Sequence, residues 1–177
     1  VSALLKACAR CHEPQIAVET YAHALEHGLR PTRAVLNALS LVYVDAGEFD
    51  QAIDYQDRAL EIYEGLEDSA GIIRTLNALS GAKLAAGYVD EALELLDQVE
   101  QSTSDNGDRA GHAMCMHLHS AALLRWGDLE NAREKVESSV VISGQMNMRF
   151  LKNRNHFLRG KIRRRKGDME GAESDLY

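Results

Sequence analysis

The chain repeats itself every 40 residues. The pentapeptide LNALS occurs at 36–40 and again, unchanged, at 76–80. A glycine followed five residues later by an alanine recurs in the same register, as Gly47/Ala52, Gly87/Ala92, Gly127/Ala132 and Gly167/Ala172. A fixed period of this size is typical of an array in which each repeat is one supersecondary unit that stacks on its neighbours. This repeat constrains the fold more strongly than any other feature of the sequence.

Each repeat contains two segments with helical spacing. In the first, Leu36, Leu39, Ser40 and Tyr43 follow the pattern i, i+3, i+4, i+7, which places them on one face of a helix. The glycine of this repeat, Gly47, predicts the end of that helix, because glycine adopts the left-handed conformation at a helix C-terminus at little cost. An acidic residue then opens the second helix, where it suits the positive end of the helix dipole. Examples are Asp50, Asp90 and Glu130.

The positions that pair the two helices always carry small residues. In the first helix of successive repeats they are Ser40, Ser80, Ser120 and Gly160. An alanine follows each of them twelve residues later. Small residues at facing positions let two backbones approach closely, so we predict that Ala52, Ala92 and Ala132 are buried at this contact. One such hairpin cannot bury its apolar faces alone and therefore stacks on its neighbours.

This spacing of a small residue, a glycine and an alanine resembles the pattern of the tetratricopeptide repeat (TPR) family over nearly the whole chain. The period is longer than the family's usual length of about 34 residues and is similar to that of kinesin light chains and MalT-type bacterial regulators. The resemblance implies an all-α fold, a right-handed superhelical solenoid of antiparallel helix pairs. Residues 1–177 would form a single array of about five hairpins, the first and last incomplete. Two departures are the missing family proline and Arg159, which stands where the family usually has leucine.

The composition fits a helical protein that folds in water. Apolar residues make up 45% of the chain, and no apolar run approaches the roughly 20 residues needed to span a bilayer. No signal peptide opens the sequence, and the odd count of three cysteines favours a reducing compartment, so we expect a cytoplasmic protein. The chain starts at Val1 without methionine and stops at Tyr177 inside an expected helix. We therefore expect a fragment of a longer protein, with open ends that favour self-association.

Two short patterns raise cofactor alternatives. The stretch CARCH places Cys8, Cys11 and His12 in the order of a c-type haem attachment motif. Both cysteines also fall on positions expected to pack against neighbouring helices, where free cysteine acts as a small apolar residue. Farther on, one helical face carries residues that could bind zinc or copper, namely His112, Cys115, Met116 and His119. Because Met116 and His119 also occupy core positions of the repeat, we expect no metal. The packing positions of the two cysteines likewise lead us to expect no haem.

Positive charge is concentrated near the end of the chain. Residues 149–166 hold nine basic residues and no acid, whereas the rest of the chain holds 11 basic and 27 acidic residues. This run either attracts an anionic partner or is neutralised internally by acidic helices such as 128–137. The net charge of −7 and the absence of a helix-turn-helix or RNA-binding motif speak against nucleic-acid binding. No phosphate-binding glycine loop, HExxH or nucleophile elbow is present, so we do not expect an enzyme.

A second stripe on the first helix of each repeat is the predicted binding surface. It lies about 100° from the packing face, and the TPR resemblance implies that it lines a concave groove for a peptide or partner helix. Its central positions are Asn37, Asn77, His117 and Phe157. We expect it to continue into a cationic end made of Arg125, Arg154, Lys161, Arg164 and Arg165. An acidic peptide fits this surface, with its backbone on the asparagine amides and its carboxylates on the guanidinium groups. Alternatively, the asparagines only bond to neighbouring helices.

Two functions are compatible with these features. The first is a non-catalytic scaffold module that binds a protein or peptide within a larger cytoplasmic regulatory protein. The second is a ligand-sensing arm like that of MalT-type transcriptional regulators, whose groove binds a small-molecule inducer. A groove of the expected shape serves both functions, so the sequence does not separate them.

Overall fold

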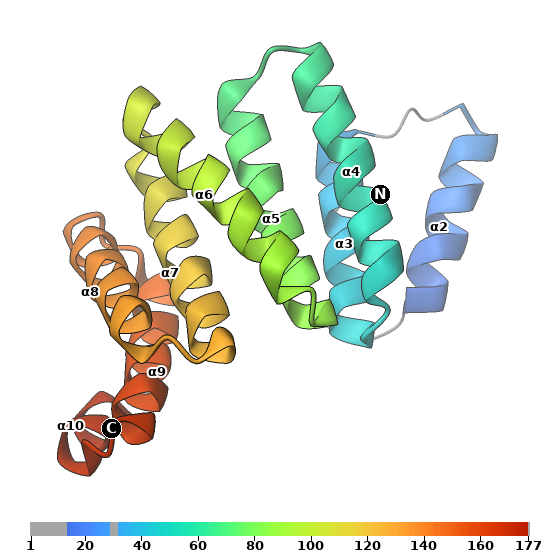
Figure 1. Ribbon diagram of the computed structural model, residues 1–177. Coiled ribbons are helices and arrows are strands. Elements are labelled where there is room, and N and C mark those ends of the chain that lie inside the picture. The colour runs from blue at the N-terminus through green and yellow to red at the C-terminus, as the bar shows by residue number, and fades with distance from the viewer. Residues whose placement is uncertain (1–13, 29–31, 177) are drawn as a thin grey trace. The chain divides into compact units, whose positions relative to one another are not determined.

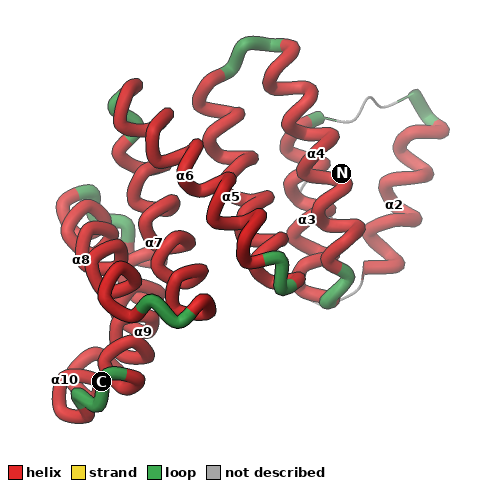
Figure 2. Tube along the Cα trace, viewed as in Figure 1, coloured by secondary structure: helices red, strands yellow, loops and turns green. Residues whose placement is uncertain are grey.

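The computed structural model describes residues 14–28 and 32–176, and all regular secondary structure among them is α-helical (Figure 1). Short turns join the consecutive helices of residues 33–176, as Figure 2 shows. The chain divides into two compact units, Val1–Tyr88 and Val89–Tyr177. The described helices of the first unit are α2 (Pro14–Glu26), α3 (Arg33–Ala46), α4 (Phe49–Gly65) and α5 (Ser69–Ala86). Those of the second unit are α6 (Val89–Asn106), α7 (Arg109–Trp126), α8 (Leu129–Gln145), α9 (Arg149–Arg165) and α10 (Met169–Leu176). The all-α prediction is confirmed, while the single array over residues 1–177 stays a prediction.

The repeated glycines end helices as predicted. Their φ angles are 79°, 96°, 102° and 85°, in the left-handed region, for Gly47, Gly87, Gly127 and Gly167. At the first of these turns, the N–H of Gly47 bonds to the carbonyl of Val44 and the N–H of Glu48 to that of Tyr43. The last carbonyls of α3 are thereby satisfied without a further partner.

Aspartates cap several of the helices that follow a turn. Asp68 and Asp108 accept hydrogen bonds of 2.9 Å from the backbone N–H groups of Gly71 and Gly111. Each bond satisfies an N–H that the first turn of a helix leaves unpaired. These caps were not predicted from the sequence, although Asp-x-x-Gly at 68–71 and 108–111 marks them. The acids expected in the first turns are in place, namely Asp50, Asp90 and Glu130.

The small residues lie where paired helices meet. Ala52, Ala92 and Ala132 are all 0% exposed, which confirms the prediction that they are buried. In the α7–α8 pair, the hydroxyl of Ser120 donates a hydrogen bond of 2.6 Å to the carbonyl of Ala132. A bond from this short side chain to the facing backbone requires a close approach of the two helices, which leaves no room for larger side chains.

Tyr55 of α4 ties three helices of the first unit together. Its ring stacks on Tyr43 of α3 at a centroid distance of 5.4 Å and meets Tyr21 of α2 edge to face at 6.1 Å. An apolar cluster around it includes Leu39 and Val42 of α3, both fully buried. Because aromatic pairs stabilise beyond their buried area by roughly 0.5–1.5 kcal/mol, Tyr55 is a central residue of this core.

The α4–α5 contact requires glycine at one position of α5. A Cβ atom on Gly71 would lie 1.8 Å from Cδ1 of Tyr63, whose side chain is buried on α4. Protein interiors are close-packed, so the ring and a side chain at position 71 exclude each other. A Cβ atom on Gly65, at the end of α4, would have no other atom within 4 Å.

In the second unit, α8 packs against both α7 and α9. The apolar core between these three helices includes Leu124, Val136, Leu158 and Ile162. Figure 1 shows α7, α8 and α9 side by side in this unit. None of the helices in residues 14–28 and 32–176 is long and apolar enough to cross a membrane.

Candidate functional site

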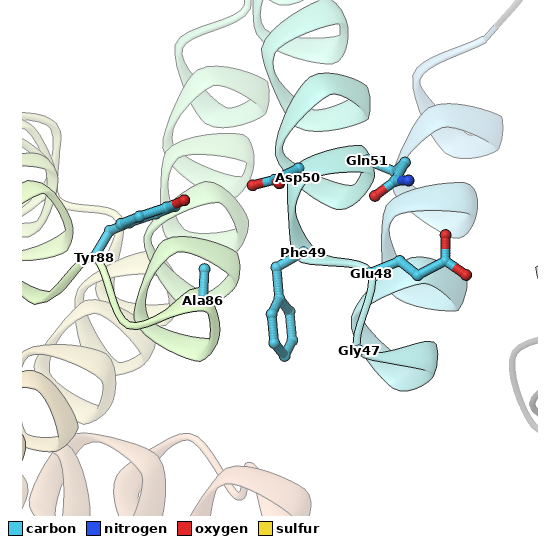
Figure 3. A pocket seen from close by; sticks show the side chains of 7 residues that line it. All are labelled: Gly47, Glu48, Phe49, Asp50, Gln51, Ala86 and Tyr88. Carbon is cyan, nitrogen blue, oxygen red and sulfur yellow. The ribbon is translucent and has the colours of Figure 1, made fainter.

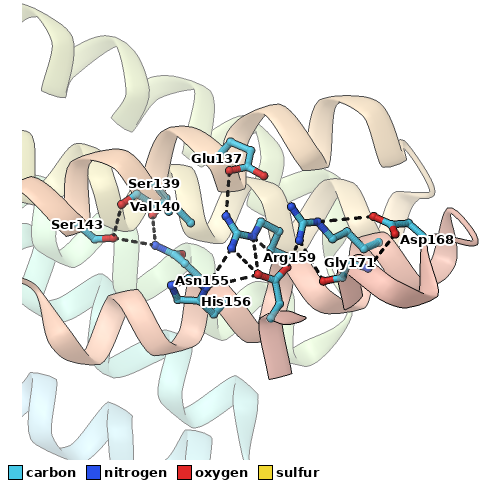
Figure 4. Close-up of polar contacts among 11 residues, drawn as sticks. Glu137, Ser139, Val140, Ser143, Asn155, His156, Arg159, Asp168 and Gly171 are labelled. Carbon is cyan, nitrogen blue, oxygen red and sulfur yellow. Dashed lines mark hydrogen bonds and ion pairs between the residues drawn. The ribbon is translucent and has the colours of Figure 1, made fainter. Parts of the chain in front are cut away.

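The basic run of α9 is divided between two faces of the helix. On the inner face, Nε of Arg159 lies 2.9 Å from both carboxylate oxygens of Asp175 in α10, and Nη1 donates to Glu137 of α8 at 3.2 Å (Figure 4). Nη1 of Arg163 lies 3.0 Å from Asp175 and also donates to the carbonyl of Gly171. These bonds join α8, α9 and α10.

The network keeps Asp175 ionised although it is buried. Its side chain is only 2% exposed, and burial by itself raises the pKa of a carboxyl group. The hydrogen bond and charge of Arg159, together with the charge of Arg163, outweigh burial and hold the pKa of Asp175 below its usual value. Arg159, which departs from the leucine of the TPR pattern, therefore has a structural role in this chain.

Two further cations of the basic run form polar contacts within the second unit. Nη1 of Arg165 donates a hydrogen bond of 2.8 Å to the carbonyl of Leu124, near the end of α7. Nζ of Lys166 pairs with Glu130 of α8. Of the two alternatives for the run, neutralisation by the acidic segment 128–137 therefore holds for Arg159 and Lys166, which pair with Glu137 and Glu130.

The opposite face of α9 carries exposed aromatic and cationic side chains. We call it the α9 stripe, and its residues are Phe150, Arg154, Phe157, Lys161 and Arg164. Their spacing of i, i+4, i+7, i+11 and i+14 places them along one helical face about 21 Å long. The phenylalanines at 150 and 157 are 73% and 54% exposed. No acid among the described residues pairs with any of the three cations.

Each phenylalanine of the stripe lies under a cation one turn later. The guanidinium carbon of Arg154 is 5.6 Å from the ring centroid of Phe150, and Nζ of Lys161 is 4.4 Å from that of Phe157. These cation–π contacts hold charge over an apolar ring. The stripe therefore presents positive charge and apolar surface together. Phe150 was not among the residues predicted from the sequence, although its seven-residue spacing from Phe157 marks the same face.

The equivalent face of α7 is covered by a helix. His117 and Leu124 lie 40 residues before Phe157 and Arg164 and are only 5% and 8% exposed. Leu124 packs in a cluster with Leu158 of α9, and Nδ1 of His117 lies 2.8 Å from Oδ1 of Asn155 in α9. In this repeat the face thus makes contact with a neighbouring helix.

His117 belongs to a buried polar network and not to an open surface. The amide of Asn155 donates to the hydroxyls of Ser139 at 2.8 Å and Ser143 at 3.2 Å (Figure 4). Its Oδ1 is left to accept from His117, which assigns the proton to Nδ1 of a neutral ring. Burial, and then the charge of Arg154, lower the pKa of His117 to about 4.

This shift makes the stability of the second unit depend on pH. An unfolded histidine takes up a proton near pH 6.5, whereas folded His117 does so near pH 4. As the pH falls through this window, the unfolded state binds the proton before the folded state does, so folding stability is lost. Above pH 6.5 both states are neutral and the contribution is fully present.

The two asparagines of the predicted surface belong to the first unit. Asn77 is 5% exposed. Asn37 is half-buried, and its Oδ1 has no hydrogen-bond partner in the described part of the chain. Whether they hold a peptide backbone or bond to a neighbouring helix stays a prediction. Arg125, which was predicted to belong to the cationic end of the surface, is exposed in the last turn of α7.

His112, Cys115 and His119, the alternative metal ligands of α7, form no common ligand group among the described residues. Nδ1 of His112 pairs with the hydroxyl of Thr103 at 2.8 Å. Cys115 is fully buried, and its thiol donates to the carbonyl of Leu96 at 3.3 Å. Burial raises the pKa of Cys115 to about 12, so the thiol stays protonated. Met116 is buried and His119 faces α6. The haem candidates lie outside the described residues: Cys8, Cys11 and His12.

A small pocket lies in the first unit at the turn between α3 and α4 (Figure 3). Residues 47–51 line it together with Ala86 and Tyr88, and its volume is about 250 Å³. Sites for small organic ligands usually have ~300–1,000 Å³ and mainly apolar walls. This pocket is smaller and includes Glu48 and Asp50, so it does not favour the inducer-sensing alternative.

Comparison with known proteins identifies the repeat. Residues 31–104 match the sequence model described as tetratricopeptide repeat. These residues belong to the TPR family. The predicted resemblance is confirmed by this match and by TPR structures with the same fold. No curated protein matches the sequence.

Solved TPR structures share the fold over almost the whole chain. A kinesin light chain-like protein of Podosopora anserina with nearly identical TPR-like repeats is 19% identical with a TM-score of 0.70. That match covers 99% of this chain and 89% of the other. BtubC (BKLC) from P. vanneervenii is 20% identical with a TM-score of 0.73, over 98% of this chain and 74% of the other. At these identities the likeness establishes the fold alone.

Proposed function

We propose that this TPR chain is a non-catalytic, cytoplasmic interaction module whose α9 stripe binds an acidic segment of a partner protein. The exposed stripe is the observation that carries the proposal: two phenylalanines and three cations alternate on one face. Aromatic residues, phenylalanine among them, and arginine are enriched in protein interfaces relative to the rest of the surface. The TPR fold, whose general role is protein–protein binding, supports the same function.

The chemistry of the stripe defines the partner. Aliphatic or aromatic side chains of the partner would cover Phe150 and Phe157, while its carboxylates would meet Arg154, Lys161 and Arg164. Planar guanidinium groups favour bidentate contacts with carboxylates. The stripe's cations pair with no acid among the described residues, so an incoming acid displaces no ion pair of that part of the chain. Arg159 differs, because its guanidinium group already pairs with Asp175 and Glu137.

Selection from a random peptide library on the full chain tests this function. We expect the enriched peptides to combine Asp or Glu with aromatic or aliphatic residues. A labelled enriched peptide, titrated by fluorescence anisotropy, should bind Phe157→Ser about tenfold more weakly than the parent chain. The control Val141→Ser removes an apolar residue of α8 that is 55% exposed and should bind as the parent does. Peptides without acids, or equal affinity for all three proteins, would contradict the proposal.

A further inference from the structure

A separate polar cluster lies in the second unit where α6, α7 and α8 meet. Its members are Asp97 and Glu100 of α6, His119 of α7 and Lys135 of α8. Nδ1 of His119 lies 3.2 Å from Oε2 of Glu100, and Nε2 lies 3.7 Å from Oδ1 of Asp97. One ligand atom from each of these three residues lies within 4.8 Å of the other two.

Within this cluster, the surroundings of His119 indicate that a ligand binds here. It is only 6% exposed, and its buried Nδ1 has no hydrogen bond of acceptable geometry to any described residue. Buried polar atoms are nearly always satisfied, so an Nδ1 that lies 3.2 Å from Glu100 without a well-aligned hydrogen bond leaves room for a further partner. Imidazole nitrogen is a common zinc ligand.

We propose that Asp97, Glu100 and His119 bind a divalent cation of the zinc class. Zinc bonds to nitrogen and oxygen of ~2.0–2.2 Å in a tetrahedral site place neighbouring ligand atoms about 3.3–3.6 Å apart. Glu100 and Nδ1 of His119, 3.2 Å apart, are already close to this separation. The side chain of Asp97 is 73% exposed and is free to turn toward the ion. Water completes the coordination, as at other zinc sites with three protein ligands.

Lys135 competes with the metal for this site. Its Nζ lies 2.7 Å from both carboxylate oxygens of Glu100, where it supplies one positive charge. Two carboxylates and one ammonium leave a net negative charge, which favours a doubly charged ion. Lys135 is 25% exposed, so its ammonium can move into water when the ion enters. Removal of Lys135 should therefore strengthen metal binding, whereas removal of a ligand weakens it.

Zinc titration of the full chain by isothermal calorimetry at pH 7 tests the site, with Zn²⁺ alone as the probe. We expect Asp97→Asn and Glu100→Gln to weaken binding by about ten- to a hundredfold, and Lys135→Met to strengthen it severalfold. Glu94→Gln is the matched control, because Glu94 is an exposed carboxylate one turn earlier on α6, and it should bind as the parent does. Asp97 is mostly exposed, so its substitution tests the site without disturbing the core.

A second measurement separates this site from adventitious binding. His23 and His27 of the first unit, both exposed, stack their rings at 4.2 Å and could also attract zinc. We expect the double variant His23→Ala, His27→Ala to retain the binding event that Asp97→Asn weakens. Zinc should also shift the ring nitrogen resonances of His119. If the parent and Lys135→Met bind no zinc, or if the histidine pair accounts for all binding, the assignment is wrong and the chain takes an adventitious ion only.

Discussion

Replacing Gly71 by alanine tests the packing of α4 against α5. The new Cβ would lie 1.8 Å from the ring of Tyr63, which is 3% exposed, so the ring must leave its place. Displacing it loses roughly 2–3 kcal/mol of apolar burial, while alanine in a helix recovers up to about 1 kcal/mol relative to glycine. We expect a net loss of about 1–3 kcal/mol in the free energy of unfolding. For a chain of this size that lowers Tm by about 3–10 °C in thermal denaturation.

Two matched variants identify the cause of this loss. Gly65→Ala adds a Cβ that meets nothing within 4 Å, so its stability should stay unchanged or rise by up to about 1 kcal/mol. In a Tyr63→Ala background the steric conflict is gone, and Gly71→Ala should no longer destabilise. Equal effects of Gly71→Ala with and without the ring would refute the described contact.

Three further outcomes are expected. Ala132→Leu should lower the free energy of unfolding by about 1–3 kcal/mol by overpacking beside Ser120; the exposed Ala70→Leu should change it by less than about 0.5 kcal/mol in the same urea titration. Between pH 6.5 and 4, stability should fall by up to about 3 kcal/mol through His117, and His117→Asn should flatten this part of the profile. Asp175→Asn should detach α10, with fast amide exchange confined to residues 169–176; protection there equal to that of the parent would contradict the role given to the network.

The repeat and the packing of its hairpins could be predicted from the sequence because they depend on local rules. A glycine in the left-handed region ends a helix wherever it occurs, and Gly47 and Gly87 do so. Small residues at facing positions admit a close contact, and Ser120 with Ala132 makes one. These features need only the helical period and the size of each side chain.

The exposure of the binding surface could not be predicted in the same way. The helical period places His117 and Phe157 on equivalent positions, but α9 covers the first while the second is 54% exposed. Adjacent arginines also differ: Arg165 donates to a backbone carbonyl of α7, whereas Arg164 is exposed on the α9 stripe. Burial and pairing depend on neighbouring helices far away in the sequence, and the period alone carries no information about them.

Reversal of a single charge on each side of α9 tests the binding function most directly. Lys161 lies in the α9 stripe, and Lys152 is an exposed lysine of the same helix on another face. Lys161→Glu and Lys152→Glu change the net charge equally, so long-range attraction falls by the same amount in both. The measurement is the dissociation constant of an enriched acidic peptide, at two salt concentrations, with Tm as the check on folding. We predict that Lys161→Glu weakens binding at least tenfold, that Lys152→Glu has a small effect which salt removes, and that both variants keep the parent's Tm. Equal losses in the two variants, or no loss in Lys161→Glu, would contradict a binding surface on the α9 stripe.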